Sequence, residues 1–105
     1  GFNIKRFLEK FKNLFSTPEI KVFCEDSNKF RIIDEIVKIT SKKHLDVSYI
    51  DGIRVNSSNG WWLIRASNTQ PALIIRCEAN SKKNLITLIK EIDILLSKFD
   101  LKLKY

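Results

Sequence analysis

Methionine is absent from this 105-residue sequence, which begins with Gly1. Because translation starts with methionine, we expect the chain to be a fragment or a processed product. Long apolar runs are absent too: none approaches the ~18 residues that a membrane-spanning helix needs. Charged residues also interrupt the apolar ones throughout the first fifteen positions. The sequence therefore predicts neither a signal peptide nor a membrane partner.

Cysteine and histidine are too few to suggest a metal site or a disulfide framework. Cys24 and Cys77 stand far apart without CxxC spacing, and the single histidine, His44, follows two lysines. Structural zinc sites and disulfide-stapled domains need clusters of such residues. We therefore expect two reduced thiols in a cytoplasmic protein, no metal ligands, and a solvated histidine near a helix end.

The residues that are present suffice for one compact domain. Hydrophobic residues make up 44% of the chain and aromatic residues 10%, which is more than disordered segments contain. The net charge of +7 favours an anionic partner, but the basic residues are mostly scattered lysines, so solubility explains the charge equally well. A basic nucleic-acid-binding module would need a basic stripe and stacking aromatics on one sheet face. That module is the alternative, although no signature of it is present and we expect no nucleic-acid partner.

An amphipathic helix is predicted over Ile4–Phe15, where apolar residues recur at i, i+3, i+4 and i+7. It ends before Pro18, because the residue before a proline is pushed out of the helical region. We expect residues 1–15 to lead in from a preceding domain or to pack on the domain formed by residues 16–105. The alternative for a basic amphipathic helix is to lie on a membrane surface.

The rest of the chain alternates between the periods of strands and helices. One helix begins near Asp26 and runs to about Lys43, and another is capped by Asn80 or Ser81 and has an apolar face that continues to Phe99. Strands are predicted at Glu19–Cys24, Leu45–Ile50, Trp61–Arg65 and Ala72–Ala79. Asp51-Gly52 is either a tight turn or a kink before Ile53–Val55. This order predicts an α+β domain with helices packed on an antiparallel sheet.

Aromatic and basic residues on these strands each have two possible roles. Trp61 and Trp62 are adjacent on a strand, so we expect one in the core and the other on the surface or against another domain. Arg54 and Arg76 can reach toward an anion, but we expect them to pair across the strands with acidic residues such as Asp51 or Glu78.

The loop Arg65–Pro71 joins the two clearest strands and is rich in hydrogen-bond donors. Reversing the chain needs only two residues such as Asn-Gly, yet this loop places a guanidinium, two hydroxyls and two carboxamides within six residues. An arginine fork matches two phosphate oxygens, and hydroxyls with successive backbone N–H groups can complete an anion nest. The residues alone leave two interpretations, an anion site or a polar hairpin loop.

The segment Gly60–Pro71, with the sequence GWWLIRASNTQP, resembles the phosphate-binding loop region of the α-D-phosphohexomutases. Its Arg-Ala-Ser-Asn-Thr sequence is similar to that of the phosphomannomutase/phosphoglucomutase branch, whereas phosphoglucosamine mutases usually carry glycine in place of Asn68. Two further stretches, Ser16–Ile20 and Asp51–Val55, agree in the same order. The resemblance covers roughly Ser16–Phe99.

The resemblance implies a part in enzymes that interconvert hexose 1-phosphates and 6-phosphates. In that family a phosphoserine, an aspartate-rich Mg2+ loop and a sugar-reading loop lie in other domains, and a glucose 1,6-bisphosphate-type sugar serves as the activator. This chain has neither a Ser-His nucleophile motif nor an Asp-x-Asp-x-Asp cluster. We therefore expect no catalytic residue, no bound metal or cofactor, and no mutase activity from this chain alone.

The resemblance also implies which residues bind. The fourth domain of such an enzyme holds the substrate phosphate that is not reacting, and it closes over the substrate. Charge-assisted hydrogen bonds are about twice as strong as neutral ones, so arginine should dominate. The expected partners are the phosphosugar and the other domains, and the expected fold is a four-stranded antiparallel sheet with helices, similar to the TATA-box-binding protein. Carried over residue by residue, the phosphate ligands would be Arg65, Ser67, Asn68 and Thr69.

Overall fold

The computed structural model describes residues 15–43 and 46–103. The helix predicted over Ile4–Phe15, apart from Phe15 itself, and the histidine His44 lie outside the described residues. The other predicted segments are confirmed, with ends that differ by a few residues. The elements follow in the order β1 (Ile20–Phe23), α2 (Asp26–Lys43), β2 (Val47–Ser48), β3 (Ile53–Ser57), β4 (Gly60–Ala66), β5 (Ala72–Ala79) and α3 (Lys82–Ser97).

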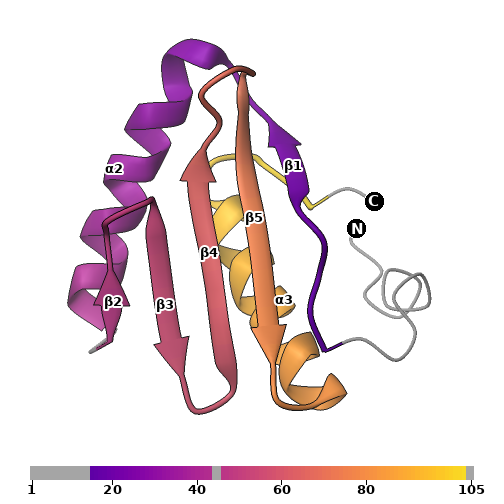
Figure 1. Ribbon diagram of the computed structural model, residues 1–105. Helices are drawn as coiled ribbons and strands as arrows, with labels where there is room; N and C mark the ends of the chain where they lie inside the picture. The colour runs from indigo at the N-terminus through magenta and orange to yellow at the C-terminus, as the bar shows by residue number, and fades with distance from the viewer. Residues whose placement is uncertain (1–14, 44–45, 104–105) are drawn as a thin grey trace.

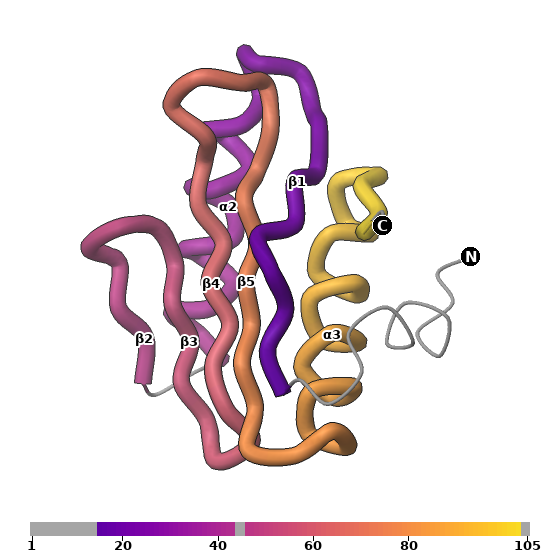
Figure 2. The backbone as a smooth tube through the Cα atoms, turned by 45° about the vertical axis from the view of Figure 1, so that its right-hand side comes forward, coloured from indigo at the N-terminus to yellow at the C-terminus, as the bar shows by residue number. Residues whose placement is uncertain are grey.

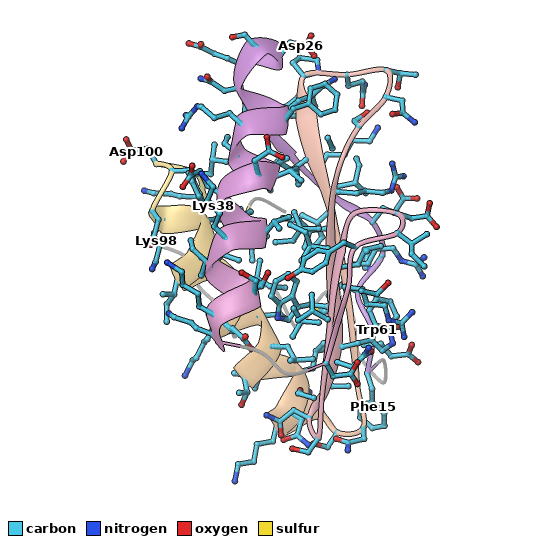
Figure 3. The ribbon with its side chains drawn as sticks, turned by 90° about the vertical axis from the view of Figure 1, so that its left-hand side faces the viewer. Phe15, Asp26, Lys38, Trp61, Lys98 and Asp100 are labelled. Carbon is cyan, nitrogen blue, oxygen red and sulfur yellow. The ribbon has the colours of Figure 1, made fainter. Side chains whose placement is uncertain are left out.

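All the described strands belong to one antiparallel sheet in the order β1-β5-β4-β3-β2 (Figure 1). The sheet has five strands rather than the expected four, because the chain reverses after Ser48 and the short β2 pairs with β3 as a strand of its own. Gly52 in this reversal has a φ of +112°, which side-chain-bearing residues rarely adopt. Both described helices pack on one face of the sheet, and neither of them covers the opposite face, which we call the open face (Figure 3). The predicted α+β architecture is confirmed.

The core lies between the sheet and the helices. Trp62 and Ile64 of β4 lie opposite Cys77 and Ile75 of β5, and all four are buried, so the core position expected for one tryptophan is that of Trp62. Burying one large apolar side chain stabilises the fold by about 1.5–3 kcal/mol, so this face fixes the register of β4 and hence where the β4–β5 loop begins. From α3 the core receives Leu85, Leu88, Ile89, Ile92 and Leu96.

The segment before β1 is bonded to the end of β5 that lies far from the β4–β5 loop. The N–H of Thr17 donates to the Cys77 carbonyl at 2.9 Å, and the Cys77 N–H donates to Thr17 Oγ1 at 3.1 Å. The Ala79 N–H donates to the Phe15 carbonyl at 2.7 Å. Figure 2 shows this segment running beside β5 into β1. The motif Ser16–Ile20 therefore ties the start of the domain to its longest strand.

Cys77 should make the fold sensitive to alkali. Burial raises the pKa of its thiol from an ordinary value of 9.0 to about 11. A pKa that is higher in the folded state stabilises the fold below pH 9, and this contribution is lost as the pH rises from about 9 to about 11. Urea unfolding should show a loss of about 2–3 kcal/mol over that range in excess of the loss in Cys77→Ala. Parallel pH profiles of the two proteins would contradict this prediction.

Candidate phosphate-binding site

Arg65 is the penultimate residue of β4 and lies opposite Ile74 of β5. Because Ile64 faces the helices, its neighbour Arg65 belongs to the open face of the sheet. Its side chain is 38% exposed, and Nη2 lies 3.8 Å from Oε1 of Glu19. An exposed ion pair of this kind contributes about 0–1 kcal/mol, so a better anion can displace Glu19 at little cost.

The loop after Arg65 is held by hydrogen bonds among its own atoms. The Ser67 N–H donates to the Ala72 carbonyl at 2.9 Å, and the Ala72 N–H donates to the Gln70 carbonyl at 2.8 Å. Ser67 Oγ accepts the N–H groups of Thr69 at 3.3 Å and of Gln70 at 3.2 Å. The amides of Ser67, Thr69 and Gln70 are therefore already engaged. The interpretation of the loop as a nest of free amides is wrong at these positions.

Ser67 differs from its neighbours because its side chain points into the loop. It is buried, whereas Asn68 and Thr69 are exposed. A hydroxyl that accepts hydrogen bonds through its oxygen still has its own hydrogen to donate. Ser67 therefore organises the turn, while Asn68 and Thr69 present their side chains to solvent.

Replacing Ser67 by alanine should destabilise the domain by about 1–3 kcal/mol, because the amides of Thr69 and Gln70 lose their acceptor in a partly buried turn. Urea unfolding measures this change. Thr69→Val, at an exposed position of the same loop, is the control and should stay within about 0.5 kcal/mol of the wild type. Equal stability of Ser67→Ala and the wild type would rule out this organising role.

A hollow of about 480 Å³ opens beside the loop, between the start of α2, the turn that joins β2 to β3, and the end of β4. Two of the four predicted ligands, Arg65 and Asn68, meet in its wall. Ser67 and Thr69 are outside this lining, the first inside the loop and the second at its exposed surface. The described lining residues are Phe30, Ile33, Asp51, Gly52, Arg65, Ala66 and Asn68.

Gly52 lets the β2–β3 turn lie against β4 at Arg65. A Cβ atom on Gly52 would be 2.6 Å from Cβ of Arg65 and 2.7 Å from the Ile64 carbonyl oxygen, both too short for real side-chain contacts. The motif Asp51–Val55 therefore borders the site. The sequence predicted a turn or a kink here but did not connect it with Arg65.

Lys29 is the residue of this region that the sequence analysis missed. It is buried, and its Nζ donates to the Ser67 carbonyl at 2.8 Å and to the Gln70 carbonyl at 3.1 Å. The signal in the sequence was the buried stripe of α2, which includes Ile32 and Ile36 and continues one turn back to Lys29. A lysine on a buried stripe needs oxygen acceptors, and the loop supplies them.

Trp61 lies on the open face of the sheet, which Figure 3 shows turned away from the helices, and its side chain contacts two charged residues. Its Nε1 donates to Oε2 of Glu78 at 3.2 Å, and the guanidinium of Arg54 lies 4.3 Å from the centre of its ring. Among the described residues, the recorded partners of Arg54 are Trp61 and Asn56, and neither is an acid. The reason is the strand order, since β4 with Trp61 lies between β3 and β5.

The family model for the phosphoglucomutase/phosphomannomutase C-terminal domain matches residues 19–95. The chain belongs to this family. A phosphomannomutase/phosphoglucomutase of Pseudomonas putida is 45% identical over 75 residues, which make up 71% of this chain and 16% of that protein. A phosphoglucosamine mutase of Methanocaldococcus jannaschii is 33% identical over 72 residues, or 68% of this chain and 16% of that protein.

Solved structures agree with this assignment. A phosphoglucomutase/phosphomannomutase family protein of Burkholderia thailandensis matches with a TM-score of 0.71 and 28% identity, over 95% of this chain and 21% of that chain. The chain therefore spans less than a fifth of the length of the curated relatives named above. It corresponds to the C-terminal domain of these phosphoglucomutase/phosphomannomutase enzymes.

The described part of this family domain contains no group of three His, Cys, Asp or Glu side chains placed to hold a metal ion. None of its described helices is both long and apolar enough to cross a membrane. Within the lining of the hollow, Arg65 and Asn68 are the described side chains that can donate hydrogen bonds to an anion.

Proposed function

We propose that this domain holds the non-reacting phosphate of a hexose phosphate while the enzyme interconverts the 1-phosphate and the 6-phosphate. Arg65 is the main ligand, because its planar fork of N–H groups matches two phosphate oxygens. Asn68 and Thr69 add neutral donors, and the hydroxyl hydrogen of Ser67 completes the set. Recognition depends on the phosphate and little on the sugar, since either phosphate must fit after the bisphosphorylated intermediate reorients.

The observation that carries the proposal is the meeting of Arg65 and Asn68 in one hollow of about 480 Å³. The contact of the guanidinium with Glu19 is long, at 3.8 Å, and exposed, so binding a dianion costs little in broken contacts. Bonds inside the loop already fix its backbone. Donors held in place before binding lose little conformational entropy when the ligand arrives.

Anchoring a remote phosphate lets its binding energy orient the reacting end of the sugar. Closure of the domain over the substrate excludes water that would hydrolyse the phosphoenzyme. We assign the phosphoserine, Mg2+ and the bisphosphorylated activator to the rest of the enzyme, so this chain alone is inactive as a mutase. The proposal includes the 1–15 segment as the approach from the neighbouring domain. It also includes a cytoplasmic location, in keeping with the free thiols of Cys24 and Cys77.

An NMR titration of the 15N-labelled chain tests the proposal. Glucose 1,6-bisphosphate or inorganic phosphate, added at constant pH and ionic strength, should shift the amide signals of Ser67 to Gln70 first. Unphosphorylated glucose is the matched control and should leave these signals in place. If saturating phosphate moves other surfaces and not this loop, the assigned site is wrong.

A phosphoglucosamine mutase is the second candidate, because one relative carries that name. Asn68 favours the first candidate, since phosphoglucosamine mutases usually have glycine there. Equal affinities for glucose 6-phosphate and glucosamine 6-phosphate are expected if the domain binds the phosphate alone, and a clear preference for the amino sugar would favour the second candidate. A nucleic-acid module is disfavoured, because Arg54 covers the Trp61 ring at 4.3 Å where a base would have to stack.

A further inference from the structure

Lys29 carries a buried positive charge against the β4–β5 loop. It is 5% exposed, and its Nζ contacts the carbonyl oxygens of Ser67 at 2.8 Å and of Gln70 at 3.1 Å and Oδ1 of Asp26 at 2.8 Å. Figure 3 shows Asp26 at the top of α2, at the same end of the molecule as this loop. We infer that Lys29 is a positioning residue that fixes the loop in the shape that binds phosphate, an inference that rests on the proposed function.

The ammonium group acts through the loop and not on the ligand. Two of its neighbours, the carbonyl oxygens of Ser67 and Gln70, accept hydrogen bonds from Nζ, and the carboxylate of Asp26 forms an ion pair with it. The lysine side chain is only 6% exposed, and Lys29 is not among the described residues that line the hollow. Arg65 differs from Lys29 in exposure and in position, because its side chain is partly exposed and lines the hollow.

The two carbonyls that Lys29 contacts lie at the two ends of the binding segment. Ser67 and Gln70 flank Asn68 and Thr69, so one ammonium joins both ends of the dipeptide that carries two of the four proposed ligands. Ser67 Oγ joins the same segment from within, through the amides of Thr69 and Gln70. Without Lys29 the two carbonyls lose a charge-assisted partner, and the dipeptide can take other conformations.

Lys29 also leaves positive potential behind the loop. The side chain of its counterion Asp26 is 70% exposed, whereas the lysine side chain is 6% exposed. Water screens the exposed carboxylate more strongly than the buried ammonium. The side of the loop that faces the ligand therefore retains a net attraction for an anion.

The first test replaces Lys29 by methionine in the 105-residue chain, which keeps the side-chain length and removes the charge and the donors. The Kd for inorganic phosphate, measured from the amide shifts of the loop at fixed pH and ionic strength, should rise about ten-fold, or about 1.4 kcal/mol. Asp26→Asn is the matched control. It alters the same ion pair from its exposed side and retains both carbonyl contacts of Nζ, so the Kd should change less than about three-fold.

The amide signals of β5 and α3 show whether Lys29→Met is folded. If it is not, Lys29→Arg is the variant to test. Arginine keeps the charge and N–H donors but not the compact geometry of an ammonium. Its Kd should therefore lie above that of the wild type by about three-fold and below that of a folded Lys29→Met. A wild-type Kd in Lys29→Arg would show that the geometry of the ammonium does not matter and would overturn the inference.

A second comparison separates positioning from general stability. In a chain with both Asn68→Ala and Thr69→Ala, the ligands that Lys29 positions are gone, so adding Lys29→Met should raise the Kd less than about three-fold. The same ten-fold rise in both backgrounds, or an unchanged Kd in folded Lys29→Met, would overturn the inference. If the wild-type loop does not respond to phosphate, the proposed function fails as well. If the Kd for phosphate is the same in Lys29→Met and the wild type, the inference about Lys29 fails while the proposed function stands.

Discussion

Replacing Arg65 by alanine should raise the Kd of the chain for phosphate by about ten-fold to a hundred-fold. A hydrogen bond to a charged group contributes about 1.5–3 kcal/mol, and Arg65 is the one cation among the described residues that line the hollow. The free energy of unfolding should change little, because the ion pair with Glu19 is long and exposed. In the full-length enzyme the loss should appear chiefly in kcat/KM.

Arg76→Ala is the matched control for Arg65→Ala. Arg76 is exposed on the same face of the sheet, two residues beyond Ile74 on β5, and its removal changes the net charge equally. Its Kd should stay within about three-fold of the wild type, as expected for a charge screened by solvent. Arg65→Lys, which keeps the charge and loses the planar fork, should fall between wild type and alanine. Equal losses in Arg65→Ala and Arg76→Ala would mean that phosphate is attracted by net charge and not bound at this site.

Gly52→Val should destabilise the domain by about 3 kcal/mol and weaken phosphate binding together. The φ of +112° is strained for a β-branched residue, at a cost of about 1–3 kcal/mol. The new Cβ would also collide with Cβ of Arg65 and the Ile64 carbonyl oxygen, and relieving such overpacking costs about 1–3 kcal/mol more. The collision lies at the base of the main proposed ligand, so relief of the strain moves Arg65 itself.

Urea unfolding and the phosphate titration of the same protein measure the two effects of Gly52→Val. Asp51→Ala is the control, since Asp51 is exposed in the same turn and its replacement should alter stability by less than about 0.5 kcal/mol. Gly52→Ala should give most of the valine effect, because the first carbon already makes the short contacts. A Gly52→Val protein with wild-type stability would show that the turn can move away from β4 at no cost.

Residue patterns in the sequence predict the helices and strands of the domain, because the periodicity of apolar residues depends only on neighbours along the chain. The two-residue period of β4 predicts that one of the two tryptophans lies in the core, and the structure shows that it is Trp62. The 3.6-residue period of the last helix predicts its buried face. The division of Leu45–Val55 into two strands could not be predicted, because Asp51-Gly52 indicates a turn and a kink equally. The pairing of β2 with β3 in the folded sheet decides between them.

The inside of the site could not be predicted, because the direction of a loop side chain depends on contacts between distant parts of the chain. Ser67, Asn68 and Thr69 have similar polar character, and nothing local shows that Ser67 alone points inward. Lys29 lies 38 residues before Ser67, so its role depends on how α2 packs against the loop. The resemblance of the loop to a known family supplied the ligand hypothesis that residue chemistry alone left open.

The hydrogen bonds between the segment before β1 and the end of β5 place the attachment of this segment far from the β4–β5 loop. Phe15 and Thr17 are attached near Ala79, whereas the loop lies beyond Ala72 at the other end of the strand (Figure 1). Seven steps of ~3.3 Å separate these ends by about 23 Å. A rotation of the domain by about 10° about Phe15 would therefore carry the loop through about 4 Å, which exceeds the length of a hydrogen bond. In the closure that we propose, this small rotation would bring Arg65 within reach of a phosphate oxygen or withdraw it.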